Sequence, residues 1–81
     1  MKVQVRLFAA ARQMAGRDSV EVELPGGATV ADLRSRLAED FPALAPLLPA
    51  VLFAIDHRYA ADAAAIPPGA ELACIPPVSG G

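Results

Sequence analysis

The stretch Glu71–Gly81, which reads ELACIPPVSGG, decides how the rest of the chain must be arranged. Its apolar first half predicts a final strand at 71–75. Pro76 and Pro77 then end that strand, because proline lacks the N–H donor that a sheet ladder needs and favours an extended, polyproline-like path. Two glycines without Cβ atoms, which can pass through a narrow channel, close the chain. The sequence therefore predicts a folded body over 1–75 and an extended, flexible tail over 76–81.

The tip of this tail carries one reactive group, the α-carboxylate of Gly81. Six extended residues span about 20 Å, enough to enter a partner's active site while the body stays outside. A terminal carboxylate, with a reference pKa of about 3.3–3.7, is ionised at neutral pH and is a poor electrophile, so it would need activation. Gly80 is expected to matter because it must thread through the same channel. The alternative is a frayed terminus without function.

Composition narrows the class of protein. The 81 residues fit one domain, and the 54% of hydrophobic residues favours a folded body over a disordered one. The net charge is −2 and the basic residues form no run, so no nucleic acid partner is expected. A single cysteine excludes an internal disulfide, and no metal-type spacing is present. Cys74 is expected to be a small core residue, with a redox or persulfide role as the alternative.

No membrane or export segment is expected. The most apolar region, 43–55, is interrupted by Pro46 and Pro49 and falls short of the ~18–20 residues that a membrane span needs. The N-terminus opens directly into a strand pattern, so no signal peptide is visible. The expected compartment is the cytoplasm.

Alternating apolar residues predict two strands near the N-terminus, at 2–8 and 19–24. Phe8 is the exception, since it is an aromatic residue on the polar side of the first strand. Helix formers over 9–15 predict a short helix that ends at Gly16. The inward residues of the two strands are Val3, Val5, Leu7, Val20, Val22 and Leu24.

A main helix of about three turns is predicted after Thr29. Thr29 and Asp32 have the spacing of a capping box, with Asp in place of the usual Glu or Gln. Apolar residues then recur at spacings of three and four until Pro42 ends the helix. These apolar positions are Val30, Leu33, Leu37 and Phe41. A compact loop or a 3₁₀ turn is expected over 43–49.

The second half of the body predicts further strands. The continuous apolar run 51–55 favours a central or well-covered strand, and Asp56-His57 favours a turn into a short strand at 58–60. A catalytic histidine usually needs a positioned partner, so His57 is expected to be a solvated turn residue. A proline-glycine turn at 67–69 leads into the final strand.

This order of elements predicts an α+β fold of the β-grasp type. It has a mixed sheet of about four to five strands, with the main helix on one face and the other face open. In that topology the first and last strands run side by side and parallel. Phe8 and Ile75 should then be neighbours near the root of the tail, joined by Tyr59. An exposed apolar cluster suggests a partner surface. The alternative is that the loop 43–49 covers it.

Three stretches carry a resemblance to a known family: LFAAAR at 7–12, TVADLR at 29–34 and IPPVSGG at 75–81. The chain resembles the MoaD/ThiS group of ubiquitin-like sulfur carriers and, within it, the small subunit of molybdopterin synthases. The proline-containing lead to the final glycines is specific to that branch. The chain departs from the family at Asp56, where Asn is frequent, and at the turn 68–71. Both departures lie in turns.

The resemblance implies a function in molybdenum cofactor biosynthesis. An activating enzyme that uses ATP and Mg²⁺ would adenylate Gly81, and a sulfurtransferase would convert it to a thiocarboxylate. The tail would then enter the large catalytic subunit, within a heterotetramer, and donate sulfur to cyclic pyranopterin monophosphate. The chain alone would be a carrier that binds no cofactor and is not an enzyme. The residues expected to contact partners are Phe8, Tyr59, Ile75, Pro76, Pro77, Val78 and Ser79.

Three other functions remain open from the sequence. The chain could carry sulfur for another pathway, such as thiamin or cysteine synthesis. It could be a ubiquitin-like modifier that is joined through Gly81 to lysines of other proteins. It could also be a plain binding module whose tail is inert.

Overall fold

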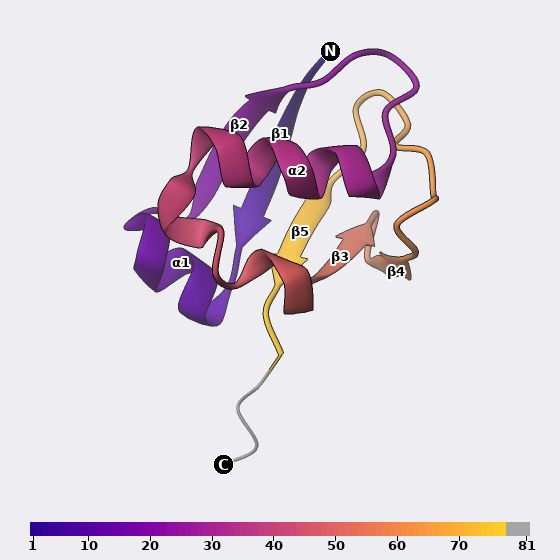
Figure 1. The fold of residues 1–81 in the computed structure, drawn as a ribbon. Coiled ribbons are helices and arrows are strands. Elements are labelled where there is room, and N and C mark those ends of the chain that lie inside the picture. Colours follow the sequence, from indigo (N-terminus) through magenta and orange to yellow (C-terminus); the bar gives the residue numbers. More distant parts are fainter. Residues whose placement is uncertain (78–81) are drawn as a thin grey trace.

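In the computed structural model, which describes residues 1–77, five strands form one mixed sheet in the order β2-β1-β5-β3-β4 (Figure 1). The strands are β1 (Lys2–Leu7), β2 (Ser19–Glu23), β3 (Leu52–Ile55), β4 (Arg58–Ala60) and β5 (Leu72–Ile75). The α-helices are α1 (Ala9–Ala15) and α2 (Val30–Asp40), and two 3₁₀ turns follow, η1 (Pro42–Leu44) and η2 (Leu48–Ala50). The predicted β-grasp fold is confirmed.

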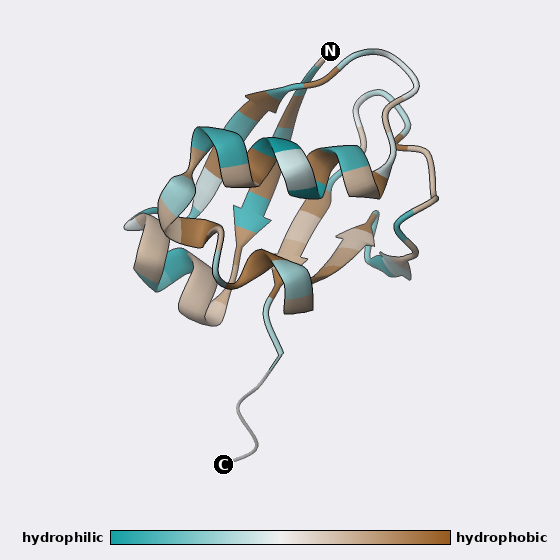
Figure 2. Cartoon of the chain, in the orientation of Figure 1, coloured by the Kyte–Doolittle hydropathy of each residue, from teal (hydrophilic) through white to brown (hydrophobic). Residues whose placement is uncertain are grey.

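The central pairing of the sheet joins the two ends of the chain. β1 and β2 form an antiparallel hairpin, while β1 and β5 run parallel, with Leu7 opposite Cys74. β5 pairs on its other side with β3, which pairs with β4, both antiparallel. Figure 2 shows hydrophobic and hydrophilic residues alternating along β1 and β2, as the sequence predicts. The tail therefore leaves from the middle of the sheet.

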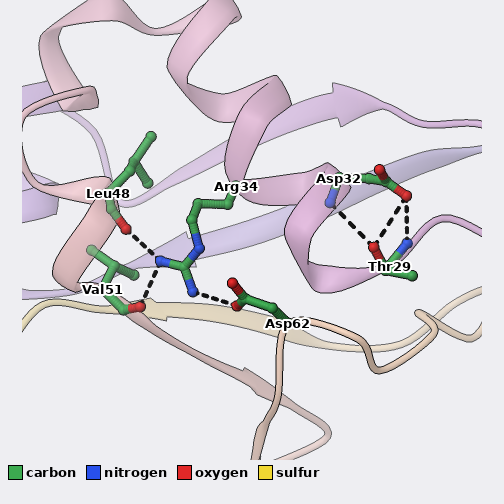
Figure 3. A network of polar contacts seen from close by, with 6 residues as sticks. All are labelled: Thr29, Asp32, Arg34, Leu48, Val51 and Asp62. Carbon is green, nitrogen blue, oxygen red and sulfur yellow. Dashed lines mark hydrogen bonds and ion pairs between the residues drawn. The ribbon is translucent and has the colours of Figure 1, made fainter.

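The predicted capping box begins α2 at Thr29. The Thr29 Oγ1 accepts a hydrogen bond from the Asp32 amide at 3.3 Å, and the Asp32 carboxylate accepts one from the Thr29 amide at 2.9 Å (Figure 3). Val30, Leu33 and Leu37 are fully buried against the sheet. The sequence thus predicted the start of this helix and three residues of its buried face correctly, whereas the fourth, Phe41, is the C-cap and is only partly buried.

The segment after α2 packs on the helix side of the molecule. It contains the predicted 3₁₀ structure, with η1 in contact with both α1 and α2, and η2 in contact with α2. Leu44 and Leu48 are buried in the core. The alternative that the loop 43–49 covers the open sheet face is therefore wrong.

One strand expectation needs correction. The apolar run 51–55 contains β3, which is an inner strand of the sheet, but the strand is not covered throughout: Phe53 and Ala54 are buried, whereas Leu52 is 53% exposed. A strand with only one covered face must point alternate residues to solvent, whatever their hydrophobicity. Leu52 therefore lies on the open face of the sheet.

Candidate functional site: the open sheet face and the root of the tail

Four large apolar side chains line the open face near the root of the tail. The Phe8 amide donates to the Cys74 carbonyl at 3.2 Å, which holds Phe8 beside the end of β5. Ile75 is half-buried and lies opposite Leu52 in the β3–β5 ladder, while Tyr59, on β4, is 69% exposed. We call Phe8, Leu52, Tyr59 and Ile75 the open-face patch. The predicted proximity of Phe8 and Ile75 is confirmed.

A hollow of about 280 Å³ lies within this face. One row across the sheet runs from Arg6 through Ala73 and Ala54 to Tyr59. The two alanines are small, so the larger side chains of the outer strands stand above them. The hollow is lined by Arg6, Phe8, Ala54, His57, Tyr59, Glu71, Leu72, Ala73 and Ile75. The three predicted patch residues thus share one concave surface.

Charged groups border this hollow. The Arg6 guanidinium lies 5.5 Å from the centre of the Phe8 ring, within reach of a cation–π interaction. At the other end, His57 Nε2 is 3.2 Å from a Glu71 carboxylate oxygen. Asp56 holds this end in place, because its carboxylate accepts from the Glu71 amide at 2.9 Å and its amide donates to the Glu71 carbonyl at 2.8 Å. The hollow therefore combines an apolar floor with a charged border.

His57 is a turn residue, as predicted. Its side chain is 85% exposed, and both Asp56 and His57 have positive φ angles, 49° and 70°. Two successive left-handed residues are typical of the tight hairpin turn that joins paired strands such as β3 and β4. The contact between His57 and Glu71 was not predicted. It depends on how the turn lies against β5.

The two prolines at the root of the tail differ in burial, since Pro76 is buried and Pro77 is exposed. Both line a second hollow, of about 480 Å³, on the helix side. We call it the root hollow, and its other lining residues are Ala9, Ala10, Gln13, Pro46, Leu47 and Ala50. The predicted site residues Val78, Ser79, Gly80 and Gly81 lie outside the described residues, so their roles stay predictions.

The Cys74 side chain points from β5 into the core and is fully buried, as expected for a core residue. Burial raises the pKa of its thiol to about 11, an effect that the positive charge of Arg34 partly offsets. The thiolate, which is the nucleophilic form, is therefore scarce at neutral pH. The structure favours the core role over the persulfide role.

Two further expectations concern metals and membranes. Within residues 1–77, no group of three or more His, Cys, Asp or Glu side chains is arranged to hold a metal ion. No helix in that part of the chain is long and apolar enough to cross a membrane.

Sequence reasoning missed Leu52 as part of the open-face patch and Arg6 as part of the border of the hollow. Leu52 stood in a continuous apolar run, where periodicity cannot assign a side. Arg6 alternates onto the same side of the first strand as Phe8, but no sequence pattern places it beside a hollow. The strand register supplies the missing signal, because it places Leu52 opposite Ile75 and Arg6 opposite Ala73.

The sequence and fold of this chain were compared with those of known proteins. The molybdopterin synthase sulfur carrier subunits of Arabidopsis thaliana and Chlamydomonas reinhardtii are 35% and 36% identical to this chain, cover all of it, and are themselves covered over 84% and 100% of their lengths. The crystal structure of SAMP1 from Haloferax volcanii superposes with a TM-score of 0.86 at 32% identity, over 100% of both chains. The model of the ThiS family matches residues 5–81. The chain therefore belongs to the ThiS family.

Proposed function

We propose that this chain is the sulfur-carrier subunit of a molybdopterin synthase and acts in molybdenum cofactor biosynthesis. The observation that carries the proposal is an exposed apolar patch beside the root of a tail ending in two glycines. Relatives with this name match over the whole chain, tail included. A carrier needs these two parts, because one surface must dock while a separate group does the chemistry.

The proposed chemistry takes place at the Gly81 carboxylate. A carboxylate oxygen attacks the α-phosphorus of ATP and pyrophosphate leaves, so the carbonyl carbon of the acyl-adenylate becomes electrophilic. A sulfide-level sulfur from a sulfurtransferase displaces AMP and leaves a thiocarboxylate. The thiocarboxylate sulfur is the nucleophile that is delivered to cyclic pyranopterin monophosphate. Water then supplies the oxygen that restores the carboxylate. Two such transfers provide both sulfurs of the dithiolene.

The proposed partners supply the catalytic groups. The activating enzyme provides the ATP and Mg²⁺ site, and the large synthase subunit provides the bases that act on the pterin, within a cytoplasmic heterotetramer. The open-face patch would dock on both partners in turn. A buried apolar anchor can contribute about 2 kcal/mol or more to such an interface. The tail residues Val78, Ser79 and Gly80 would contact each partner along the channel through which Gly81 reaches the active site.

A second candidate function is protein modification. The solved structures that match this chain include two of the H. volcanii small archaeal modifier protein, or SAMP1, at 30–32% identity. A modifier would use the same activation of Gly81, but a lysine amine of a target protein would displace AMP and form an isopeptide bond. The open-face patch fits either function, because both need an activating enzyme.

The deciding experiment is to purify the chain from its native host and measure its intact mass. Replacement of one C-terminal oxygen by sulfur is the expected result. The thiocarboxylate form should then produce molybdopterin with the large subunit, whereas a chain lacking Gly81 should not. Higher-mass conjugates on a denaturing gel, with no sulfur at the C-terminus, would support the modifier and contradict the carrier.

A further inference from the structure

The burial pattern of β5 continues beyond the end of the strand. Leu72 and Cys74 point into the core, and Ala73 and Ile75 point to the open face. Pro76 continues this alternation, because it is buried on the core side, whereas Pro77 is exposed. The packed body therefore ends one residue later than the hydrogen-bonded ladder does.

Two elements flank Pro76 on the helix side. α1 contributes Ala9 and Ala10 to the root hollow, and the segment around η2 contributes Leu47 and Ala50. Figure 1 shows the chain leaving β5 between these two elements. On the strand side, Leu52 pairs with Ile75 and the Phe8 amide donates to the Cys74 carbonyl. Both sides of the root are thus defined by the body, up to and including Pro76.

Proline suits this position for two reasons. It has no N–H that burial would leave without a hydrogen-bond partner. Its φ angle is also fixed near −65°, so packing of its ring sets the direction in which the next residue leaves. A residue with a free φ angle in the same place would let the tail swing about the end of β5.

We propose that Pro76 is a positioning residue, whose packing between α1 and η2 fixes the direction of the tail. This inference rests on the proposed function. It leaves five residues, 77–81, between the anchor and the terminal carboxylate, and five residues span at most about 17 Å when extended. A shorter tether with a fixed origin raises the effective concentration of its tip at a site that the docked body faces. Pro76 would thus act on Gly81 without touching the reacting atoms.

The neighbouring prolines provide a matched pair of variants for the test. Pro76→Gly removes the buried ring, and Pro77→Gly makes the same chemical change at the exposed position. Both variants should be prepared as thiocarboxylates. Three quantities should be measured for each: the thermal unfolding midpoint, the affinity for the large subunit and the single-turnover rate of sulfur transfer. The affinity separates docking from positioning, because the open-face patch is intact in both.

We expect Pro76→Gly to bind within about twofold of the unsubstituted chain but to transfer sulfur roughly tenfold more slowly, since small misplacements of a reacting group cost large factors in rate. Pro77→Gly should lose clearly less. Equal transfer rates in the two variants would overturn the proposal. A loss of affinity in Pro76→Gly that accounts for its whole rate loss would overturn it as well.

A second variant perturbs the anchor without changing the tail. Ala10→Glu places a charged side chain in the root hollow from α1, and it should reproduce slow transfer at unchanged affinity. If Pro76→Gly does not fold, Ala10→Glu decides by the same criterion. Absence of any sulfur transfer by the unsubstituted chain would count against the proposed function alone. A carrier and a modifier both need adenylation of Gly81. The adenylation rates of Pro76→Gly and Pro77→Gly would then be compared in place of the sulfur-transfer rates.

Discussion

The thiol of Cys74 links the stability of this protein to alkaline pH. Its pKa is raised from the usual 9.0 to about 11 by burial, so the folded chain holds this proton more tightly than the unfolded chain does. The resulting stability is fully present below pH 9 and is lost as the pH rises from 9 to 11. A shift of this size corresponds to about 2–3 kcal/mol. Urea unfolding at pH 8 and pH 10.5 should show the loss. The Cys74→Ala variant should lose less stability between these two pH values. An equal loss of unfolding free energy in both proteins would contradict the assignment to Cys74.

At the same scale, a substitution of Gly80 tests whether the tail passes through a narrow channel in each partner. Gly80→Ala adds one methyl group next to the carbonyl of Gly81. A channel shaped around bare backbone would resist it, and a shift of about 1 Å can cost on the order of a hundredfold in rate. The variant should dock normally on the large subunit through the open-face patch but be adenylated or discharged slowly. Unchanged single-turnover rates would mean that neither active site confines this residue.

At the scale of elements, Arg34 joins α2 to the start of β3. Its Nη1 donates to the carbonyls of Leu48 and of Val51, the latter at 2.7 Å, and its Nη2 pairs with Asp62 at 2.7 Å (Figure 3). The guanidinium also lies 5.0 Å from the centre of the Phe53 ring. Val51 directly precedes Leu52, so this fork helps to set where β3 meets the end of β5.

Arg34→Lys should therefore destabilise the fold although it keeps the charge. A lysine ammonium cannot reproduce the planar fork. The Leu48 and Val51 carbonyls are partly buried, and an acceptor left without a donor costs about 1–3 kcal/mol when burial is complete. Arg36→Lys is the matched control on the same helix, since Arg36 pairs with Glu39 and Asp40 at the helix surface. It should change stability by less than about 0.5 kcal/mol. Denaturant unfolding measures both. Equal effects would show that the fork contributes little.

The elements also show what the sequence could and could not predict. Alternation gave β1 and β2, and the capping box gave the start of α2, because these signals are local. Burial of Pro76 and the contacts of Arg34 were missed, because they depend on the path of the segment 42–50. Arg34 reaches carbonyls 14 and 17 residues away, and no short-range pattern encodes that distance. The patch residues Phe8, Tyr59 and Ile75 were accessible to prediction only because the β-grasp topology brings the first and last strands together.

At the scale of the whole molecule, the core lies under α2 and the open-face patch, the proposed docking surface, lies on the opposite side of the sheet. Tyr59→Ser should therefore weaken binding to both the large subunit and the activating enzyme by roughly 30-fold, or about 2 kcal/mol. The reason is that an exposed aromatic side chain contributes free energy only when a partner covers it. Its unfolding midpoint should change little, since the side chain is 69% exposed.

Met14→Ser is the control for Tyr59→Ser, because Met14 is 44% exposed on α1, outside the patch. Isothermal titration calorimetry against each partner measures the affinities. If Met14→Ser weakens binding as much as Tyr59→Ser does, or if Tyr59→Ser lowers the unfolding midpoint in proportion to its loss of affinity, the open face is not the shared docking surface.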